Sequence, residues 1–412
     1  MTNILQVSIG DKNIGTLACL PSGSVFFAFD SGYTNDPKRL VLSQSFYQTS
    51  GKIIQETVAT SGRLPAFFSN LLPEGYMRNY LAKHGGIKPS QEFKLIELLG
   101  ADLPGAVIVR PFGENSGVLA HADEHDCKTA QDQKPYRFSL AGIQLKFSAI
   151  AGIHGKLTIP ASGVGGDWII KLPSQNYAHV PENEYAMMHL AGEIGIPAPE
   201  TRLVELRDID GLPEMGVLSG SRALAVKRFD RAEGGKRIHI EDFAQVYNIY
   251  PDKKYDGVSF ANIASMVWAL TGEVGLIDFI RRLTFTIVIG NGDMHLKNWS
   301  FIYEDGYAPS LAPAYDMVST IPYIPTDDLA LNLSDTKDMR IIALDHFKKL
   351  VKKAQIPEHL VLETVSDTVD ATLLAWNSHY KNYDLDPGII EHIQKHMNSL
   401  ALKNYILRCK ML

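Results

Sequence analysis

The segment from Gly290 to Asn298 combines residue types that can carry out phosphoryl transfer. It reads Gly-Asn-Gly-Asp-Met-His-Leu-Lys-Asn and follows an apolar stretch, 276–289, that we expect to be helical. Its glycines can end that helix and adopt backbone angles that other residues avoid. Asp293 and Asn298 are five positions apart, so one loop could hold a carboxylate and an amide towards the same point.

A second carboxylate, Asp316, is expected to return to this loop through a β-hairpin. The apolar alternation of residues 299–311 around an Asp-Gly pair predicts two antiparallel strands and a tight turn. Pairing Tyr303 with Tyr307 would then bring Asp316 back beside Asn298, although 18 positions separate the two residues.

Phosphoryl transfer requires a carboxylate that accepts the proton of the attacking hydroxyl, and oxygen ligands that hold Mg²⁺ on the phosphates. We therefore predict Asp293 as the catalytic base and Asn298 and Asp316 as magnesium ligands, with His295 and Lys297 near the phosphates. The alternative is that Asp293 caps a turn and Asp316 caps a helix. The occurrence of all three residues at a spacing compatible with a hairpin favours the catalytic interpretation.

A kinase also needs a lysine on the nucleotide phosphates. The strand-like segment 168–173 carries Lys171, and Glu184 lies near the start of an expected helix over 181–196 and could pair with it. Spacing alone favours a simpler interpretation, in which Lys171 is a surface lysine and Glu184 is stabilised by the helix dipole.

Two glycine-containing segments could approach phosphates. Residues 138–147 contain one glycine between strand-like stretches, and backbone amides in such a turn can cradle an anion. A plain hairpin is the alternative for this segment. Residues 162–167 carry three glycines, and we interpret them as a structural turn.

The composition is that of a globular protein, with 412 residues, 45% hydrophobic and 21% charged. The net charge of −6 argues against a protein that grips nucleic acid alone, because such binding depends on many Lys and Arg contacts to phosphate. Cys19, Cys127 and Cys409 are too far apart in sequence to indicate a zinc site or a disulfide framework. The first residues do not resemble a signal peptide, and apolar runs such as 285–290 are too short to cross a bilayer, so we expect a cytoplasmic protein.

Strand-like patterns dominate the first half of the chain and helical patterns the second, which predicts an α+β protein with a small β-rich lobe and a larger helical lobe. In chain order we expect strands at 14–20 and 25–29, helices over 67–100, a polar linker over 114–135, strands from 136 to 204 and at 223–229, and mostly helix after 242 apart from the hairpin.

An ordered set of motifs resembles the HipA-type serine/threonine kinases, which are toxins of bacterial toxin–antitoxin pairs. The similar segments are 67–75, 100–106, 139–146, 170–173, 183–185, 223–231, the Gly-Asp-x-His-x-x-Asn loop at 292–298, and Tyr315 with Asp316. They extend over most of the chain, so chance similarity is a poor explanation.

The resemblance implies a bilobal protein-kinase-like fold, related to lipid kinases, with a small β-rich N-terminal lobe, an extra N-terminal subdomain and a mostly helical C-terminal lobe. The corresponding divisions are 1–130 for the extra subdomain, 131–235 for the lobe with the phosphate loop, and 236–412 for the helical lobe. ATP and Mg²⁺ are the implied cofactors. The implied ATP contacts are Ala141, Gly142, Ile143, Gln144, Leu145, Lys146, Lys171, Lys227, Arg228, Phe229, His295, Lys297, Asn298, Tyr315 and Asp316.

The resemblance also implies autophosphorylation of Ser139, which in the family expels the phosphate loop and silences the enzyme. A phosphate group adds about −1.5 to −2 charge, which would repel the phosphates of ATP. The implied partners are a small helix-turn-helix antitoxin and a protein substrate, for which aminoacyl-tRNA synthetases are typical of the family. Residues 334–340, where a basic DNA-facing loop is expected, have mixed charge, so we expect DNA contact only through the antitoxin. The basic run 348–353 has helical spacing and is interpreted as a solvated face.

Two other functions remain open from the sequence. The same loop could phosphorylate a small molecule, although the segment 67–75 and Ser139 argue against this. The chain could also be a degenerate kinase that acts mainly as a corepressor with its antitoxin, although Asp293, Asn298 and Asp316 are all present.

Overall fold

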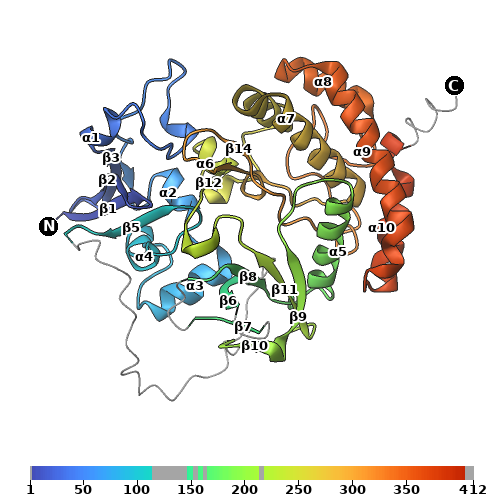
Figure 1. Ribbon diagram of the computed structural model, residues 1–412, viewed down its shortest axis with the longest axis horizontal. Helices are drawn as coiled ribbons and strands as arrows, with labels where there is room; N and C mark the ends of the chain where they lie inside the picture. Colours follow the sequence, from blue (N-terminus) through green and yellow to red (C-terminus); the bar gives the residue numbers. More distant parts are fainter. Residues whose placement is uncertain (1, 114–145, 152–155, 161–164, 213–217, 404–412) are drawn as a thin grey trace.

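The chain forms an N-terminal five-stranded sheet, a six-stranded sheet and a helical C-terminal lobe (Figure 1). The structure is a computed structural model and describes residues 2–113, 146–151, 156–160, 165–212 and 218–403. The expected linker over 114–135 and the loop over 138–145 lie outside the described residues.

The first sheet has the strand order β4-β3-β2-β1-β5 and is covered by short helices. Its elements are β1 (Asn3–Ile9), β2 (Lys12–Cys19), β3 (Ser24–Phe29), α1 (Ser31–Thr34), the 3₁₀ helix η1 (Gln44–Phe46), β4 (Thr60–Ser61), α2 (Ala66–Asn70), α3 (Gly75–His84), α4 (Glu92–Leu99) and β5 (Val107–Pro111). Phe27, Phe67 and Phe68 are fully buried and pack edge-on or tilted, so this N-terminal subdomain has an aromatic core of its own.

The second sheet has the order β10-β7-β6-β8-β11-β9. Its elements are β6 (Lys146–Ala151), β7 (Leu157–Thr158), β8 (Trp168–Lys171), β9 (Thr201–Glu205), β10 (Ile209–Asp210) and β11 (Arg222–Lys227), with α5 (Val180–Glu193) packed on β9 and β11. Central strand β8 pairs antiparallel with β6 and with β11, so Lys171 is held at the end of a strand that has neighbours on both sides.

The C-terminal lobe is built around a long apolar helix and a three-stranded sheet of order β12-β13-β14 (Figure 1). Its elements are β12 (His239–Asp242), α6 (Phe243–Val246), the 3₁₀ helix η5 (Pro251–Lys253), α7 (Phe260–Ile289), the 3₁₀ helix η6 (Leu296–Asn298), β13 (Ser300–Tyr303), β14 (Ser310–Leu311), α8 (Leu344–Ala354), α9 (Glu358–His379) and α10 (Pro387–Ser399). Sequence patterns predicted mostly helix after 242, but residues 312–343 form turns and extended segments instead.

Helix α7 is longer and more apolar than the sequence suggested. Within the described residues it is the one helix whose length and hydropathy would suffice to cross a membrane. It packs against α8, α9 and α10, and most of its second half is buried in the lobe, so the core of this lobe accounts for its composition. The expected helical stretch 276–289 covers only its second half, and Gly272 divides α7 with the non-helical angles φ +66° and ψ −151°.

The expected hairpin is present, but its register differs from the predicted one. Phe301 lies opposite Leu311, which excludes the predicted pairing of Tyr303 with Tyr307. The Asp305 carboxylate accepts hydrogen bonds from the backbone N–H groups of Tyr307 and Ala308, at 2.7 and 2.9 Å. This Asx-type turn makes the connection longer than the three residues of the predicted pairing, which sequence alternation alone cannot reveal.

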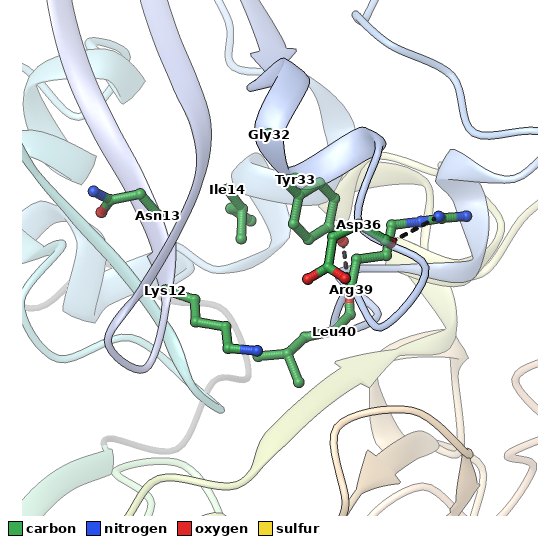
Figure 2. Close-up of a pocket in the computed structure, with 8 residues that line it drawn as sticks. All are labelled: Lys12, Asn13, Ile14, Gly32, Tyr33, Asp36, Arg39 and Leu40. Atoms are coloured by element: carbon green, nitrogen blue, oxygen red, sulfur yellow. Dashed lines mark hydrogen bonds between the residues drawn. The ribbon is translucent and has the colours of Figure 1, made fainter.

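A cavity of about 230 Å³ lies in the N-terminal subdomain between the start of β2 and the segment that follows α1 (Figure 2). Its lining residues are Lys12, Asn13, Ile14, Gly32, Tyr33, Asp36, Arg39 and Leu40. None of them was predicted as a site residue. In Figure 2 the Arg39 guanidinium points away from Lys12 and Asn13, so the charged groups around the cavity do not converge on one point.

Candidate active site

Helix α7 ends at Gly290, and this end positions the predicted catalytic loop. Gly290 has φ +70°, the left-handed conformation typical of a glycine that terminates a helix. The Asn291 side chain then links two parts of the site. Its Oδ1 accepts a hydrogen bond from the backbone N–H of Asp293 at 3.0 Å, and its Nδ2 donates to the backbone oxygen of Asp316 at 3.3 Å. The loop and the segment after the hairpin are therefore joined directly.

Asp293 is accessible and is held in place by two neighbours. Its Oδ1 accepts a hydrogen bond from the Tyr255 hydroxyl at 2.6 Å, and its backbone oxygen accepts one from Nδ2 of Asn298 at 2.8 Å. Withdrawal from bulk water raises the pKa of the Asp293 carboxyl, and the hydrogen bond from Tyr255 opposes that rise. About half of the side chain, 53%, remains exposed, so a substrate hydroxyl can reach it.

Lys171 lies between two carboxylates, those of Glu184 and Asp316. Its ammonium group forms ion pairs with both, and only 5% of its side chain is exposed. The interpretation of Lys171 as a surface lysine is therefore wrong, and so is that of Glu184 as a simple helix-dipole residue. Spacing could not reveal the pairing, since 145 positions separate Lys171 from Asp316.

Asp316 receives a second cation from strand β6. Nζ of Lys146 lies 2.7 Å from Oδ2 of Asp316. Burial alone would raise the pKa of the Asp316 carboxyl, but the charges of Lys146 and Lys171 hold that pKa well below its usual range. Asp316 also has φ +56°, a strained conformation for a residue other than glycine, which is typical of functional sites. Asp316 is therefore an ionised carboxylate.

His295 is a buried, neutral imidazole beside Asp293. Desolvation by burial, together with the charge of Lys254, lowers the pKa of His295 to about 3. Its ring packs edge-on against Tyr255 with 5.0 Å between ring centroids, and Nε2 lies 3.9 Å from Oδ1 of Asp293. Its Nδ1 is buried without a hydrogen-bond partner. The predicted phosphate contact of His295 would therefore come from an uncharged ring.

Lys297 has partners other than those the prediction required. Its ammonium group donates to the backbone oxygen of Asn70 at 2.8 Å and to Asp242 at 3.0 Å, and lies 3.6 Å from Glu74. It therefore ties the catalytic loop to the N-terminal subdomain. A contact between Lys297 and phosphate stays a prediction, and it would require the ammonium group to leave these acceptors.

The remaining predicted ATP contacts form two groups. Some lie in the described residues and have other partners there, and the others lie outside the described residues. Tyr315 is half-buried, its hydroxyl donates to the backbone oxygen of Lys297 at 2.9 Å, and its ring lies 5.7 Å from that of Phe229. The Arg228 guanidinium pairs with Asp230, so its side chain has a structural partner, whereas the Lys227 side chain is exposed. Ser139 and the predicted loop contacts Ala141, Gly142, Ile143, Gln144 and Leu145 lie outside the described residues.

Asn298 and Asp316 carry oxygen donors of the kind that a hard divalent cation prefers. Each Asp316 oxygen is ion-paired with a lysine, so Lys146 or Lys171 would have to move to admit a metal. Asn298 is buried, and because its Nδ2 is bound to Asp293, its Oδ1 is the atom left to serve as a ligand. An amide oxygen, a carboxylate held ionised by lysines, and phosphate oxygens from a nucleotide form the kind of ligand set that Mg²⁺ uses. In the part of the chain that the structure describes, no group of three or more His, Cys, Asp or Glu side chains is arranged to hold a metal ion. Mg²⁺ commonly uses one or two protein ligands together with phosphate oxygens and water.

Comparison with protein families decides the identity of the chain. The model of the HipA-like C-terminal domain matches residues 138–376, and that of the HipA N-terminal domain matches residues 5–110. The chain belongs to the HipA family. The sequence resemblance is thereby confirmed over both parts of the molecule.

Relatives of the HipA family match along nearly the whole chain. Protein Y4dM of Sinorhizobium fredii is 45% identical over 403 residues, which cover 97% of each chain. The serine/threonine-protein kinase toxin HipA of Shewanella oneidensis is 27% identical and covers 89% of this chain and 86% of that protein.

A solved structure of Shewanella oneidensis HipA, in complex with HipB and operator DNA, aligns with a TM-score of 0.75, 22% identity and 99% coverage of both chains. The expected α+β, bilobal kinase-like fold is confirmed by this match.

Several residues of the candidate site were not predicted from sequence. Tyr255 contacts Asp293, Asn291 joins the two halves of the site, and Lys254 with Glu74 links the site to the N-terminal subdomain. The one available signal was Asn291, which lies between the two glycines of the loop. Tyr255 and Glu74 are distant in sequence from Asp293, and no periodicity or spacing connects them.

Proposed function

We propose that this HipA-family protein is an ATP- and Mg²⁺-dependent serine/threonine protein kinase that acts as the toxin of a toxin–antitoxin pair. The observation that supports this most strongly is the ion-paired arrangement of Glu184, Lys171 and Asp316 beside the loop that carries Asp293 and Asn298. Protein kinases require an ion pair between a strand lysine and a helix glutamate, together with an aspartate that holds Mg²⁺, before they transfer phosphate.

The reaction would use each of these groups in turn. Asp293 accepts the proton of a serine or threonine hydroxyl while the hydroxyl oxygen forms a bond to the γ-phosphorus of ATP. The bond between that phosphorus and the β–γ bridging oxygen breaks, and ADP leaves. Bound Mg²⁺, held by Asn298 and Asp316, would neutralise charge on the phosphate oxygens. Lys171 would orient the α- and β-phosphates while Glu184 and Asp316 hold its ammonium group in place.

The test is phosphate transfer by the purified, unphosphorylated protein with Mg-ATP. We expect Ser139 to become labelled, as measured by intact mass and peptide mapping. Asp293→Asn should reduce the rate by about 10²–10⁴-fold, the usual contribution of a general base, without preventing ATP binding. Asp305→Asn is the matched control, since Asp305 is an exposed carboxylate in the hairpin loop. No phosphate incorporation by the wild-type protein would rule out the proposal.

The biological role that we propose follows from the family. We infer a small helix-turn-helix antitoxin as partner, contact with DNA through that partner, a cytoplasmic location, and a protein substrate involved in translation. The solved complex of Shewanella oneidensis HipA with HipB and operator DNA supports the first two inferences. Ser139 phosphorylation would silence the kinase by repelling ATP. Co-purification of the chain with the product of a neighbouring gene, followed by an operator-binding assay, tests the partnership.

A further inference from the structure

The N-terminal subdomain contacts the catalytic loop through a short arm of the C-terminal lobe. This arm consists of Lys254 and Tyr255, directly after η5. Nζ of Lys254 lies 3.0 Å from Oε2 of Glu74, which precedes helix α3 of the N-terminal subdomain. The Tyr255 hydroxyl donates to Oδ1 of Asp293 at 2.6 Å. Glu74 of the N-terminal subdomain and Asp293 of the C-terminal lobe are therefore linked through two consecutive residues, Lys254 and Tyr255.

The arm is fixed to the loop at its backbone as well. The backbone N–H of Leu296 donates to the backbone oxygen of Lys254 at 3.2 Å. Glu74 also lies 3.6 Å from Lys297, a residue of the same loop. Lys297 of the loop and Lys254 of the arm thus converge on one carboxylate, and moving Glu74 would disturb both of them.

The Tyr255 ring has two neighbours in the site. It packs edge-on against His295, and Nζ of Lys254 lies 5.7 Å from its centroid. The residue is nevertheless 42% exposed, so Tyr255 lies at the surface where a protein substrate would present its hydroxyl to Asp293. Its hydroxyl occupies one oxygen of Asp293 and leaves the other for the acceptor.

We propose that Tyr255 is a positioning residue for Asp293, and that Glu74 of the N-terminal subdomain sets its position through Lys254. This inference rests on the proposed kinase function. A general base must lie within hydrogen-bonding distance of the hydroxyl it deprotonates, and a displacement of about 1 Å can cost on the order of 100-fold in rate. The N-terminal subdomain is therefore part of the machinery that aligns the base, as well as a separate folded unit.

The experiment compares steady-state phosphorylation by full-length Tyr255→Phe and Lys254→Met proteins with that of wild type. A hydrogen bond to a charged group contributes about 1.5–3 kcal/mol, so we expect kcat to fall about 10- to 100-fold. The KM for ATP should stay unchanged, because neither side chain is among the proposed ATP contacts. Lys254→Arg keeps the charge that pairs with Glu74 and should retain most of the activity.

Matched controls come from neighbouring or similar residues. Tyr307→Phe removes the hydroxyl of another exposed tyrosine, and Lys253→Met removes the exposed lysine next to Lys254. Both should behave as wild type. Thermal unfolding of each variant shows whether it is folded, and Tyr255→Phe is conservative enough to keep the fold. In the double variant Lys254→Met/Tyr255→Phe the two losses should not add, because both act through one hydroxyl.

The outcomes separate this inference from the proposed function. Inactive wild-type protein would overturn the kinase proposal itself. Active wild type with undiminished kcat in both folded variants would overturn only the positioning role. A raised KM for the protein acceptor with unchanged kcat would also overturn it, because Tyr255 would then act in acceptor binding.

Discussion

At the scale of single residues, the central feature is one lysine shared by two carboxylates. The side chains of Lys171 and Glu184 are 5% and 2% exposed, so both charges are removed from water. Burial opposes a charge on Lys171, but the carboxylates of Asp316 and Glu184 outweigh it and raise the pKa of the ammonium group. Lys171 is therefore charged because two carboxylates face it, whereas burial and the nearby charge of Asp316 raise the pKa of Glu184.

Lys171→Met should consequently destabilise the protein strongly. Removing one member of a buried ion pair leaves an uncompensated charge and costs about 3–5 kcal/mol in the free energy of unfolding. Urea denaturation at pH 7 measures this loss. The double variant Lys171→Met/Glu184→Gln should recover part of the stability, because Glu184 would no longer carry an unpaired charge. Lys395→Met, which removes an exposed lysine, is the control, and equal stability of Lys171→Met and Lys395→Met would contradict the argument.

The sequence offered candidate site residues, but only some of the contacts between them. Asp293, Asn298 and Asp316 were expected to meet, and Asn291 and Asn298 do bridge this region. Glu184, 13 positions from Lys171, was named as a possible partner, and the structure confirms that pair. The contacts of Lys171 with Asp316 and of Lys297 with Asn70 could not be inferred, since 145 and 227 positions separate these residues. Local patterns describe the backbone within about ten residues, whereas such contacts depend on how whole elements pack.

At the scale of elements, the end of α7 determines where the catalytic loop begins. A Cβ atom at Gly290 would lie 2.4 Å from Cγ1 of Ile321 and 3.1 Å from the His396 ring, in addition to having φ +70°. Gly234 has a similar φ of +73°, but nothing lies within 4 Å of its would-be Cβ. A substitution at Gly234 therefore introduces backbone strain alone, whereas a substitution at Gly290 introduces backbone strain and a steric clash.

Gly234→Ala should cost about 1–2 kcal/mol, the penalty of a left-handed conformation for an L-residue. Gly290→Ala should cost about 1–3 kcal/mol more, because the added methyl group must displace packed side chains. Chemical denaturation of both variants gives the comparison. Phosphate transfer should fall in Gly290→Ala alone, since the loop that carries Asp293 starts there. Equal destabilisation by the two substitutions would show that the contacts of Gly290 are unimportant.

A second element-scale contact joins η1 to strand β12 through a buried carboxyl group. Glu241 is fully buried, accepts hydrogen bonds from the backbone N–H of Gln44 at 3.1 and 3.3 Å, and is hydrogen-bonded to the Tyr303 hydroxyl. Burial raises the pKa of Glu241 to about 7, and these hydrogen bonds only partly oppose the rise. The folded protein thus binds this proton more tightly than the unfolded chain does.

The pH dependence of stability follows from that difference. Between the ordinary pKa of about 4.5 and the folded value of about 7, the folded state holds more protons at Glu241, so its contribution to stability decreases as pH rises. The decrease amounts to about 3 kcal/mol, since each pKa unit corresponds to about 1.4 kcal/mol. Glu241→Gln should remove this part of the slope when urea denaturation is compared at pH 5 and pH 8. Glu273→Gln, an exposed residue of α7, should leave the slope as in wild type.

The elements themselves were largely predictable. Strands β2, β3, β8 and β11, and helix α5, occur where apolar patterning placed them. The hairpin was expected, but its register was wrong because the Asp305 side chain shapes the turn. The non-helical stretch 312–343 was missed because its buried apolar residues resemble those of a core helix in composition.

At the scale of the whole molecule, the N-terminal subdomain and the second sheet meet at a buried cluster of charges. Both carboxylate oxygens of Asp230 accept hydrogen bonds from Arg228, at 2.9 and 2.8 Å, and Oδ2 also accepts from Arg231 and from the backbone N–H of Gly105, both at 2.8 Å. Arg231 pairs in turn with Asp102 of the N-terminal subdomain at 2.8 Å. The two parts of the molecule therefore share one electrostatic network.

Asp230→Asn should uncouple the unfolding of the N-terminal subdomain from that of the second sheet and the C-terminal lobe. Burial alone would raise the pKa of Asp230, but hydrogen bonds and the charges of Arg228 and Arg231 keep that pKa below its ordinary value. The ionised carboxylate therefore stabilises the fold at neutral pH, and this contribution is lost as pH falls through the acidic range. An amide at this position removes the negative charge that Arg228 and Arg231 share. The loss should cost about 3–5 kcal/mol in the free energy of unfolding at pH 7.

The four tryptophans make this uncoupling measurable, because all of them lie at or after Trp168. Tryptophan fluorescence thus reports on the second sheet and the C-terminal lobe, whereas hydrogen exchange of β1 to β5 reports on the N-terminal subdomain. In wild type the two probes should give one urea transition, since the shared network makes unfolding cooperative.

In Asp230→Asn, exchange in β1 to β5 should rise at urea concentrations where fluorescence is still native. Asp256→Asn, in an exposed pair with Lys253, should keep the two transitions together. Coincident transitions in Asp230→Asn would mean that the apolar contacts between the two parts suffice to couple them, and that the ion cluster only adds stability.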